Sequence, residues 1–271
     1  MIVTVRSLCR GGRLVLHIAS AFVLVMLFFR RPRHDSRIQR RLLQWWLRGV
    51  CRILNIQVVL QGHPQDDSLV VANHVSWLDI PVLASVWSGS FLSKQEVAGW
   101  PVLGALVRRS GTLLIRRGCT ASFGEAVTSV QHRLSLGGGV CMFPEGTTSD
   151  GRAVLSFRPR LFEAAVNAGA KVQAVALRYF DADGNLHPRA PFIGDDDFVS
   201  HLLRLLRGPA VRVEVVFLPR LSARGHAPRS LAEFAHWQVS EAMARQLGCA
   251  GHAGPDAVID DEALTEPRFA A

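Results

Sequence analysis

Residues Val70–Val82 read VVANHVSWLDIPV, a stretch in which an apolar run gives way to polar residues and then to a second apolar segment. The apolar run before Asn73 is typical of a buried strand, and Asn73 itself favours a turn. We expect Ser76 to cap the helix that follows and Asp79 to lie in its first turn. The stretch therefore predicts a strand, a turn and a helix in quick succession.

His74 and Asp79 are five residues apart within this stretch. On a continuous helix they would differ by about 140° around the axis, so they meet only if His74 lies in the turn. A carboxylate against one imidazole nitrogen fixes the tautomer and leaves the other nitrogen free to take a proton. The pair is a candidate general base, and the alternative is a helix-start histidine beside a capping acid.

Apolar segments of strand and helix length alternate along the rest of the chain. Strands are expected at residues 56–60, 68–73, 111–118, 140–146, 172–180 and 211–218, and helices at residues 77–87, 94–111 with a break, 121–136, 162–170, 198–206 and 231–247. The continuous apolar runs VCMF and VQAVAL are typical of strands that are covered on both faces. The pattern predicts an α/β fold with a mixed central sheet flanked by helices.

The positive charge of the chain is confined to its first fifth. The net charge is +9, and residues 1–52 contain eleven arginines and one acid, which is 11 − 1 = +10, so the remainder sums to −1. Between these arginines, residues 14–29 form an apolar segment with no formal charge. As a helix it would be about 24 Å long, short of a hydrocarbon core of roughly 30 Å. We expect an uncleaved membrane anchor that spans or only enters the bilayer, with a signal anchor as the alternative.

Residues 38–54 alternate arginines with leucines and include Trp45 and Trp46, a composition that suits the lipid headgroup layer. The uncharged apolar block between the basic residues argues against nucleic acid as a partner. We expect a membrane-associated helical arm over residues 1–54, a catalytic domain over residues 55–248 and a flexible tail over residues 249–271.

The five cysteines are widely spaced, with no CxxC pair and no zinc-type spacing. Such usage is typical of a reducing compartment, so we expect the globular part on the cytoplasmic face of a membrane such as the bacterial inner membrane. We expect no metal ion and no bound cofactor.

Glu145 lies between Pro144 and Gly146, directly after an expected strand. Pro ends a ladder and Gly permits unusual backbone angles, so Glu145 is expected at the carboxyl end of a strand, where ligands of α/β sheets bind. Arg116 and Arg117 end another strand, and arginine is a natural phosphate ligand. A surface turn and a solvated strand end are the alternatives.

Four blocks of the sequence, taken in order, resemble the 1-acylglycerol-3-phosphate acyltransferases, also called lysophosphatidic acid acyltransferases, of the phospholipid/glycerol acyltransferase superfamily. NHVSWLD at 73–79 is similar to the N-H-x4-D box of that family, and FPEGTTS at 143–149 to its F-P-E-G-T box. GTLLIRR at 111–117 and VQAVAL at 172–177 are similar to the second and fourth blocks.

This resemblance implies transfer of a fatty acyl group from a thioester to the free hydroxyl of a lysophospholipid. Acyl-CoA or acyl-carrier protein would be the co-substrate, and 1-acylglycerol-3-phosphate the favoured acceptor, giving phosphatidic acid. His74 would take the hydroxyl proton, and Asp79 would orient His74. The resemblance also implies a set of substrate-binding residues, namely Asn73, Arg117, Phe143, Pro144, Glu145, Gly146 and Thr147.

Two residues depart from the pattern of this family. Ala174 stands where the fourth block often has proline, and Thr148 stands where F-P-E-G-T is usually followed by arginine. The missing cation makes a lyso-ornithine lipid or another lysolipid an alternative acceptor. Three arginines near in sequence could supply the charge, namely Arg152, Arg158 and Arg160.

Other activities lack their motifs, since the sequence has no GxSxG elbow, no HExxH and no P-loop. Cys141 beside the FPEG loop is an alternative acyl-carrying nucleophile, although a mid-strand cysteine usually packs as a small core residue. A thioesterase and a lipid-binding membrane adaptor without turnover are the remaining alternatives.

Overall fold

A computed structural model of the chain describes residues 2–28, 37–99, 104, 111–116 and 120–244. Arg117, Cys119, the expected tail over residues 249–271 and most of the second half of the expected broken helix lie outside the described residues. The division into arm, catalytic domain and tail stays a prediction.

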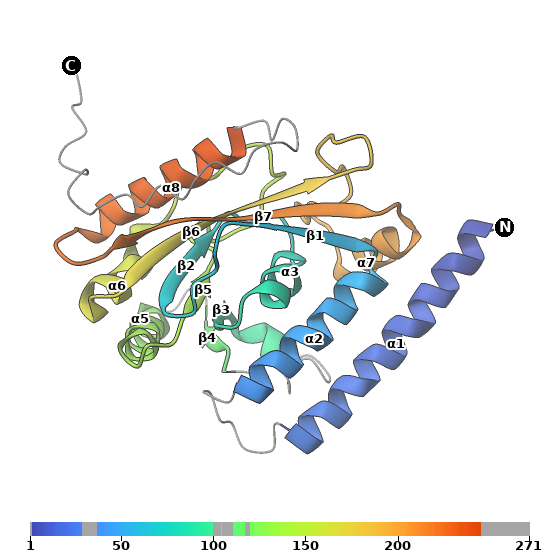
Figure 1. The fold of residues 1–271 in the computed structure, drawn as a ribbon, viewed down its shortest axis with the longest axis horizontal. Helices are drawn as coiled ribbons and strands as arrows, with labels where there is room; N and C mark the ends of the chain where they lie inside the picture. The colour runs from blue at the N-terminus through green and yellow to red at the C-terminus, as the bar shows by residue number, and fades with distance from the viewer. Residues whose placement is uncertain (1, 29–36, 100–103, 105–110, 117–119, 245–271) are drawn as a thin grey trace.

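One mixed sheet forms the centre of the described part of the molecule (Figure 1). Its strands, in the order in which they lie side by side, are β1 (Ile56–Gln61), β7 (Val211–Ser222), β6 (Lys171–Phe180), β2 (Ser68–Ala72), β5 (Val140–Met142), β3 (Ser90–Lys94) and β4 (Leu113–Ile115). β6 and β7 are antiparallel, whereas the other neighbouring strands are parallel. The predicted fold class is confirmed, and the loops that follow β2 and β5 leave the same edge of the sheet.

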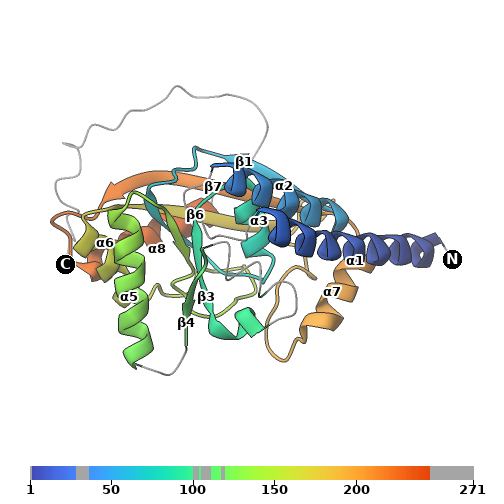
Figure 2. The same cartoon turned by 90° about the horizontal axis from the view of Figure 1, so that it is seen from below.

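Helices cover both faces of this sheet (Figures 1 and 2). One face carries α2 (Arg37–Ile53), α3 (Asp79–Val86) and α7 (Phe198–Arg207), with α1 (Ile2–Phe28) outside α2. The other face carries α5 (Thr120–Ser135), α6 (Glu163–Ala168), α8 (Pro228–Ala244) and the 3₁₀ turn η2 (Pro159–Phe162). A further 3₁₀ turn, η1 (Gln95–Gly99), follows β3.

Alternate residues of β2 enter two different hydrophobic cores. Val70 packs in the core that contains Leu83 of α3, whereas Leu69 packs in the core that contains Val130 of α5. All residues of β2 and β5, and residues 172–177 of β6, are buried. The prediction that these strands are covered on both faces is confirmed, and the covered strands give the adjoining loops a rigid support.

The N-terminal helix α1 begins well before the apolar segment that was predicted from residue 14 and includes the first arginines of the chain. It lies along α2, where the ring of His17 stacks on Trp46 with centroids 4.9 Å apart and the Trp46 indole N–H donates to His17 O at 3.1 Å. Gly49 permits this approach, because a Cβ there would lie 2.4 Å from the His17 ring. Among the described residues, α1 is the one helix long and apolar enough to cross a membrane, over Val5–Leu24.

Between β2 and β4 one strand was missed and one predicted helix is wrong. The strand β3 was not predicted, because SFLSK has little apolar periodicity and its conformation is fixed by pairing with β5 and β4. Residues 95–99 form a single 3₁₀ turn instead of the helix expected from Lys94, which itself belongs to β3.

Candidate active site

His74 lies in the turn between β2 and α3, and its side chain meets that of Asp79. Nδ1 of His74 and Oδ2 of Asp79 are 2.6 Å apart. The side chain of His74 is 18% exposed and that of Asp79 is fully buried. The two side chains can meet, as the spacing requires, because His74 lies in the turn before α3 and Asp79 is the first residue of that helix.

Asp79 also organises the turn through the backbone. Its Oδ2 accepts hydrogen bonds from the N–H groups of Val75 at 2.8 Å and Ser76 at 3.0 Å. The expectation that Ser76 caps α3 is wrong, because its hydroxyl makes no hydrogen bond in the structure and the Asp79 carboxylate binds the free amides of the turn instead. The carboxylate that contacts His74 thus also fixes the backbone around it.

Tyr179 of β6 is a further partner of Asp79 that the sequence did not predict. Its hydroxyl donates to Oδ1 of Asp79 at 2.5 Å. Burial, and then the charge of Asp79, raise the pKa of Tyr179 well above its ordinary value. The phenol therefore keeps its proton and remains a donor, so both oxygens of the carboxylate are held.

The ring of His74 is held in one orientation. Because Asp79 is an acceptor, Nδ1 carries the proton and Nε2 is left as the acceptor. One face of the ring stacks on Phe143, which follows β5, with centroids 4.1 Å apart and planes 16° apart. The partly exposed imidazole can therefore accept a proton without turning.

Glu145 reaches from the loop after β5 to the backbone of His74. Its Oε1 accepts from His74 N–H at 2.9 Å, and His74 O accepts from Ser149 N–H at 2.8 Å. Glu145 is buried, and this burial raises its pKa to about 7 against the opposing effect of its hydrogen bonds. The loop after β5 thus binds both the N–H and the carbonyl of His74 in the turn after β2.

The other residues of the predicted substrate-binding set have different surroundings. The amide of Asn73 is buried and exchanges two hydrogen bonds with the backbone of Leu177, so it ties β2 to β6. Pro144 is buried, whereas Thr147 is exposed, and Gly146 has a φ of +74° that favours glycine. The substrate contacts of this set stay a prediction.

Among the three arginines near the FPEG turn, Arg158 lies closest to it. A Cβ built on Gly146 would lie 3.1 Å from the Arg158 guanidinium carbon, whereas Arg160 lies over the ring of Phe123 at 4.4 Å. Arg152 pairs with Asp150 on the surface. Arg158 thus brings a positive charge to the turn.

Thr148 stands where the acyltransferase family usually has an arginine, and it does not take over the role of a phosphate-binding cation. Its hydroxyl donates a short hydrogen bond to Phe192 O. Thr148 therefore fastens the turn to the loop before α7 and offers no cation to a ligand.

Cys141 does not fit the role of an acyl-carrying nucleophile. It is fully buried within β5, and burial raises the pKa of its thiol well above the ordinary value. A protonated, inaccessible thiol is a poor nucleophile. Among the described residues, no cluster of histidine, cysteine, aspartate and glutamate side chains could hold a metal ion.

Comparison with known proteins places this fold and site in a class. A sequence model of the acyltransferase family matches residues 55–178. The lyso-ornithine lipid O-acyltransferase of Pseudomonas aeruginosa is 40% identical over 245 residues, which span 88% of this chain and 93% of that protein. The 1-acyl-sn-glycerol-3-phosphate acyltransferase of Neisseria meningitidis is 39% identical over 175 residues, which span 63% of this chain and 68% of that protein.

The fold itself has a solved counterpart in the 1-acyl-sn-glycerophosphate acyltransferase PlsC of Thermotoga maritima. The TM-score is 0.67 at 22% identity, and the match covers 90% of this chain and 97% of that chain. The family model and the curated relatives, which are named acyltransferases of lysolipids, show that the protein is an acyltransferase of lipid metabolism. More specifically, the chain belongs to the PlsC-type acyltransferase family.

Proposed function

We propose that this enzyme transfers a fatty acyl group from a thioester donor to the free hydroxyl of a lysolipid at a membrane surface. The observation that carries the proposal is the 2.6 Å contact between His74 Nδ1 and Asp79 Oδ2, beside the turn that holds Glu145. The names of the relatives support a lysolipid acceptor, and the apolar helix α1 supports a membrane location.

In the proposed reaction Nε2 of His74 accepts the proton of the lysolipid hydroxyl while the hydroxyl oxygen attacks the thioester carbonyl. The tetrahedral intermediate then collapses, the C–S bond breaks, and the leaving thiolate takes the proton from His74. Asp79 stays ionised and stabilises the imidazolium between these steps. Such a positioned base contributes roughly 10²–10⁴ in rate. Acyl-CoA and acyl-carrier protein both satisfy this chemistry as donors.

A lyso-ornithine lipid is the acceptor that we propose first. The relative with this activity matches nearly the whole chain, and Thr148 replaces a cation that would suit a phosphate. Lysophosphatidate is the acceptor favoured by the sequence motifs, and it is the second candidate. Relatives named as 1-acyl-sn-glycerol-3-phosphate acyltransferases match this chain at similar identity.

Arg158 is proposed to bind the acidic part of the acceptor headgroup, together with Thr147 and the turn at Gly146. Its guanidinium lies against Gly146, and either an ornithine carboxylate or a phosphate would pair with it. Arg117 is proposed to supply a second cation. The site would face the cytoplasm, where both thioester donors are present.

The acceptor test offers both lysolipids to purified protein in vesicles and identifies the products by mass spectrometry. We expect ornithine lipid as the main product with acyl-CoA or acyl-carrier protein, and little free fatty acid. A clear preference for lysophosphatidate would contradict lyso-ornithine lipid as the acceptor but would leave the proposed acyl-transfer mechanism in place. Thioester hydrolysis that does not need an acceptor would contradict acyl transfer altogether.

A further inference from the structure

Helix α1 has apolar side chains on two opposite faces. One face packs inward through Leu14 and Ala21, which are buried against the rest of the protein. The opposite face, here called the outward stripe of α1, is exposed and consists of Leu8, Val15, Leu16, Phe22, Val23 and Leu27. An exposed apolar stripe of this length marks a surface that meets another apolar phase.

Helix α7 carries a shorter ridge of the same kind. Val199 and Leu203 are four residues apart, which places them on one face, and they are 62% and 41% exposed. The buried side of the helix includes His201 and Leu205. Arg207 lies exposed in the last turn. The exposed side of α7 therefore carries these two apolar side chains beside Arg204, which pairs with Asp196 at 2.6 Å, and it ends at the cation Arg207.

Arg10 holds α1 and α7 together. Its guanidinium donates to Leu206 O at 3.3 Å and Gly208 O at 3.2 Å, which are carbonyls at the C-terminal end of α7. A cation at this end of a helix is also favoured by the helix dipole. The two helices thus form one surface even though their sequences are far apart.

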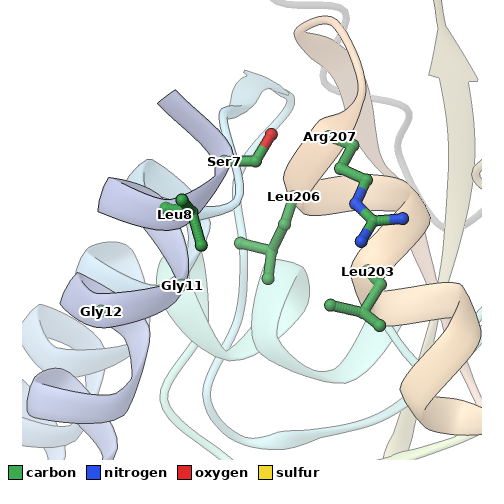
Figure 3. Close-up of a pocket in the computed structure, with 7 residues that line it drawn as sticks. All are labelled: Ser7, Leu8, Gly11, Gly12, Leu203, Leu206 and Arg207. Carbon is green, nitrogen blue, oxygen red and sulfur yellow. The ribbon is translucent and has the colours of Figure 1, made fainter. Parts of the chain in front are cut away.

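A groove of about 510 Å³ lies between the two helices (Figure 3). Helix α1 lines it with Ser7, Leu8, Gly11 and Gly12. Helix α7 lines it with Leu203, Leu206 and Arg207. A Cβ added at Gly11 or Gly12 would meet no atom within 4 Å, so the missing side chains help to keep the groove open. Leu8 belongs to both the groove and the outward stripe of α1, and the two are therefore continuous.

We propose that this groove binds one acyl chain of an anionic phospholipid drawn from the bilayer. The groove is continuous with the outward stripe of α1. A bilayer that contacts this stripe therefore also reaches the groove, which favours a lipid over a soluble partner. Arg207 at the rim, with exposed Arg6 and Arg13 on α1, selects an anionic headgroup. Helix α7 would thereby meet the membrane beside α1, and this assignment does not depend on the chemistry at His74.

The test uses the full chain in phosphatidylcholine vesicles, with or without phosphatidylglycerol, that contain a phospholipid bearing a photoactivatable diazirine on its acyl chain. Labelled peptides are identified by mass spectrometry after illumination. We expect label on residues 7–12 and on residues 203–207, and several-fold less label when phosphatidylglycerol is absent. Equal labelling with and without phosphatidylglycerol would contradict the proposed preference for an anionic headgroup.

Gly11→Phe tests the groove itself, because the ring would occupy open space and glycine is already a poor helix former. Gly124→Phe on α5 is the matched control, since a Cβ there also meets no atom. Excluding two methylene groups costs about tenfold in binding, so Gly11→Phe should lower the α7 label by roughly that factor while the control keeps it.

Leu203→Gln is a second variant, which removes apolar lining at a partly exposed position and should lower the label in the same way. Unchanged label in both variants with native circular dichroism would overturn the proposal. So would wild-type label that is confined to the outward stripe of α1, or cross-links that join α1 of one copy to α7 of a second copy in place of lipid.

Discussion

Tyr179 donates a hydrogen bond to Oδ1 of Asp79, while Oδ2 of the same carboxylate contacts His74. The carboxylate is therefore held from β6 as well as from its own turn. Tyr179 reaches the imidazole only through Asp79, so its proposed role is to position the carboxylate and disperse part of its charge.

Tyr179→Phe should lower kcat roughly tenfold, because a carboxylate held only from its own turn orients His74 less well, and each 1.4 kcal/mol of lost transition-state stabilisation is about a factor of ten in rate. The KM for the acceptor should stay nearly constant, since the phenol does not reach the substrate. Without this donor the carboxylate stabilises the imidazolium more strongly, so the acidic limb of the pH–rate profile should move to higher pH. Steady-state kinetics across pH measure both effects. A structural role alone would lower the melting temperature and leave the pH profile in place.

Thr148→Arg should move acceptor preference toward lysophosphatidate. The new guanidinium could pair with a phosphate, and a charge-assisted bond of this kind corresponds to roughly tenfold or more in kcat/KM. Thr148→Val is the matched control, because it removes the hydrogen bond to Phe192 without adding charge. Competition between the two lysolipids, read by mass spectrometry, gives the ratio. An equal shift in both variants would show that the lost hydrogen bond, and not the cation, sets the preference.

Glu145→Gln should change how stability depends on pH. Burial raises the folded-state pKa of Glu145 from 4.5 to about 7, so the folded state disfavours the charged form. Wild-type stability is therefore fully present below about pH 4.5 and declines, relative to the variant, as pH rises toward 7. The difference should reach up to roughly 3 kcal/mol. Denaturant unfolding in detergent at several pH values measures it, and a difference that is flat with pH would contradict the assigned burial effect.

The contact between His74 and Asp79 could be predicted because everything that sets it lies in one strand, turn and helix. The meeting of Glu145 with this turn needed one further rule, that loops at the carboxyl ends of neighbouring strands lie together. Even here the helix cap was wrong, because the Asp79 carboxylate takes the amides that Ser76 was expected to bind.

Tyr179 could not be predicted in the same way, since its contact with Asp79 joins positions 100 residues apart and depends on β6 lying beside β2. The one available signal was that the chain has a single tyrosine, near the end of a mostly apolar strand. Sequence proximity likewise offered three arginines for the turn, and tertiary contacts alone separate Arg158 from Arg152 and Arg160.

The central claim is that the imidazole of His74 removes the proton from the acceptor hydroxyl. The most direct measurement is the acceptor-dependent rate of thiol release from acyl-CoA by His74→Ala, with His132→Ala on the exposed surface of α5 as the matched control. The account predicts a loss of roughly 10²–10⁴ or more for His74→Ala, with vesicle binding intact and the control at the wild-type rate. Retention of a substantial fraction of the wild-type rate by a folded His74→Ala protein would contradict it.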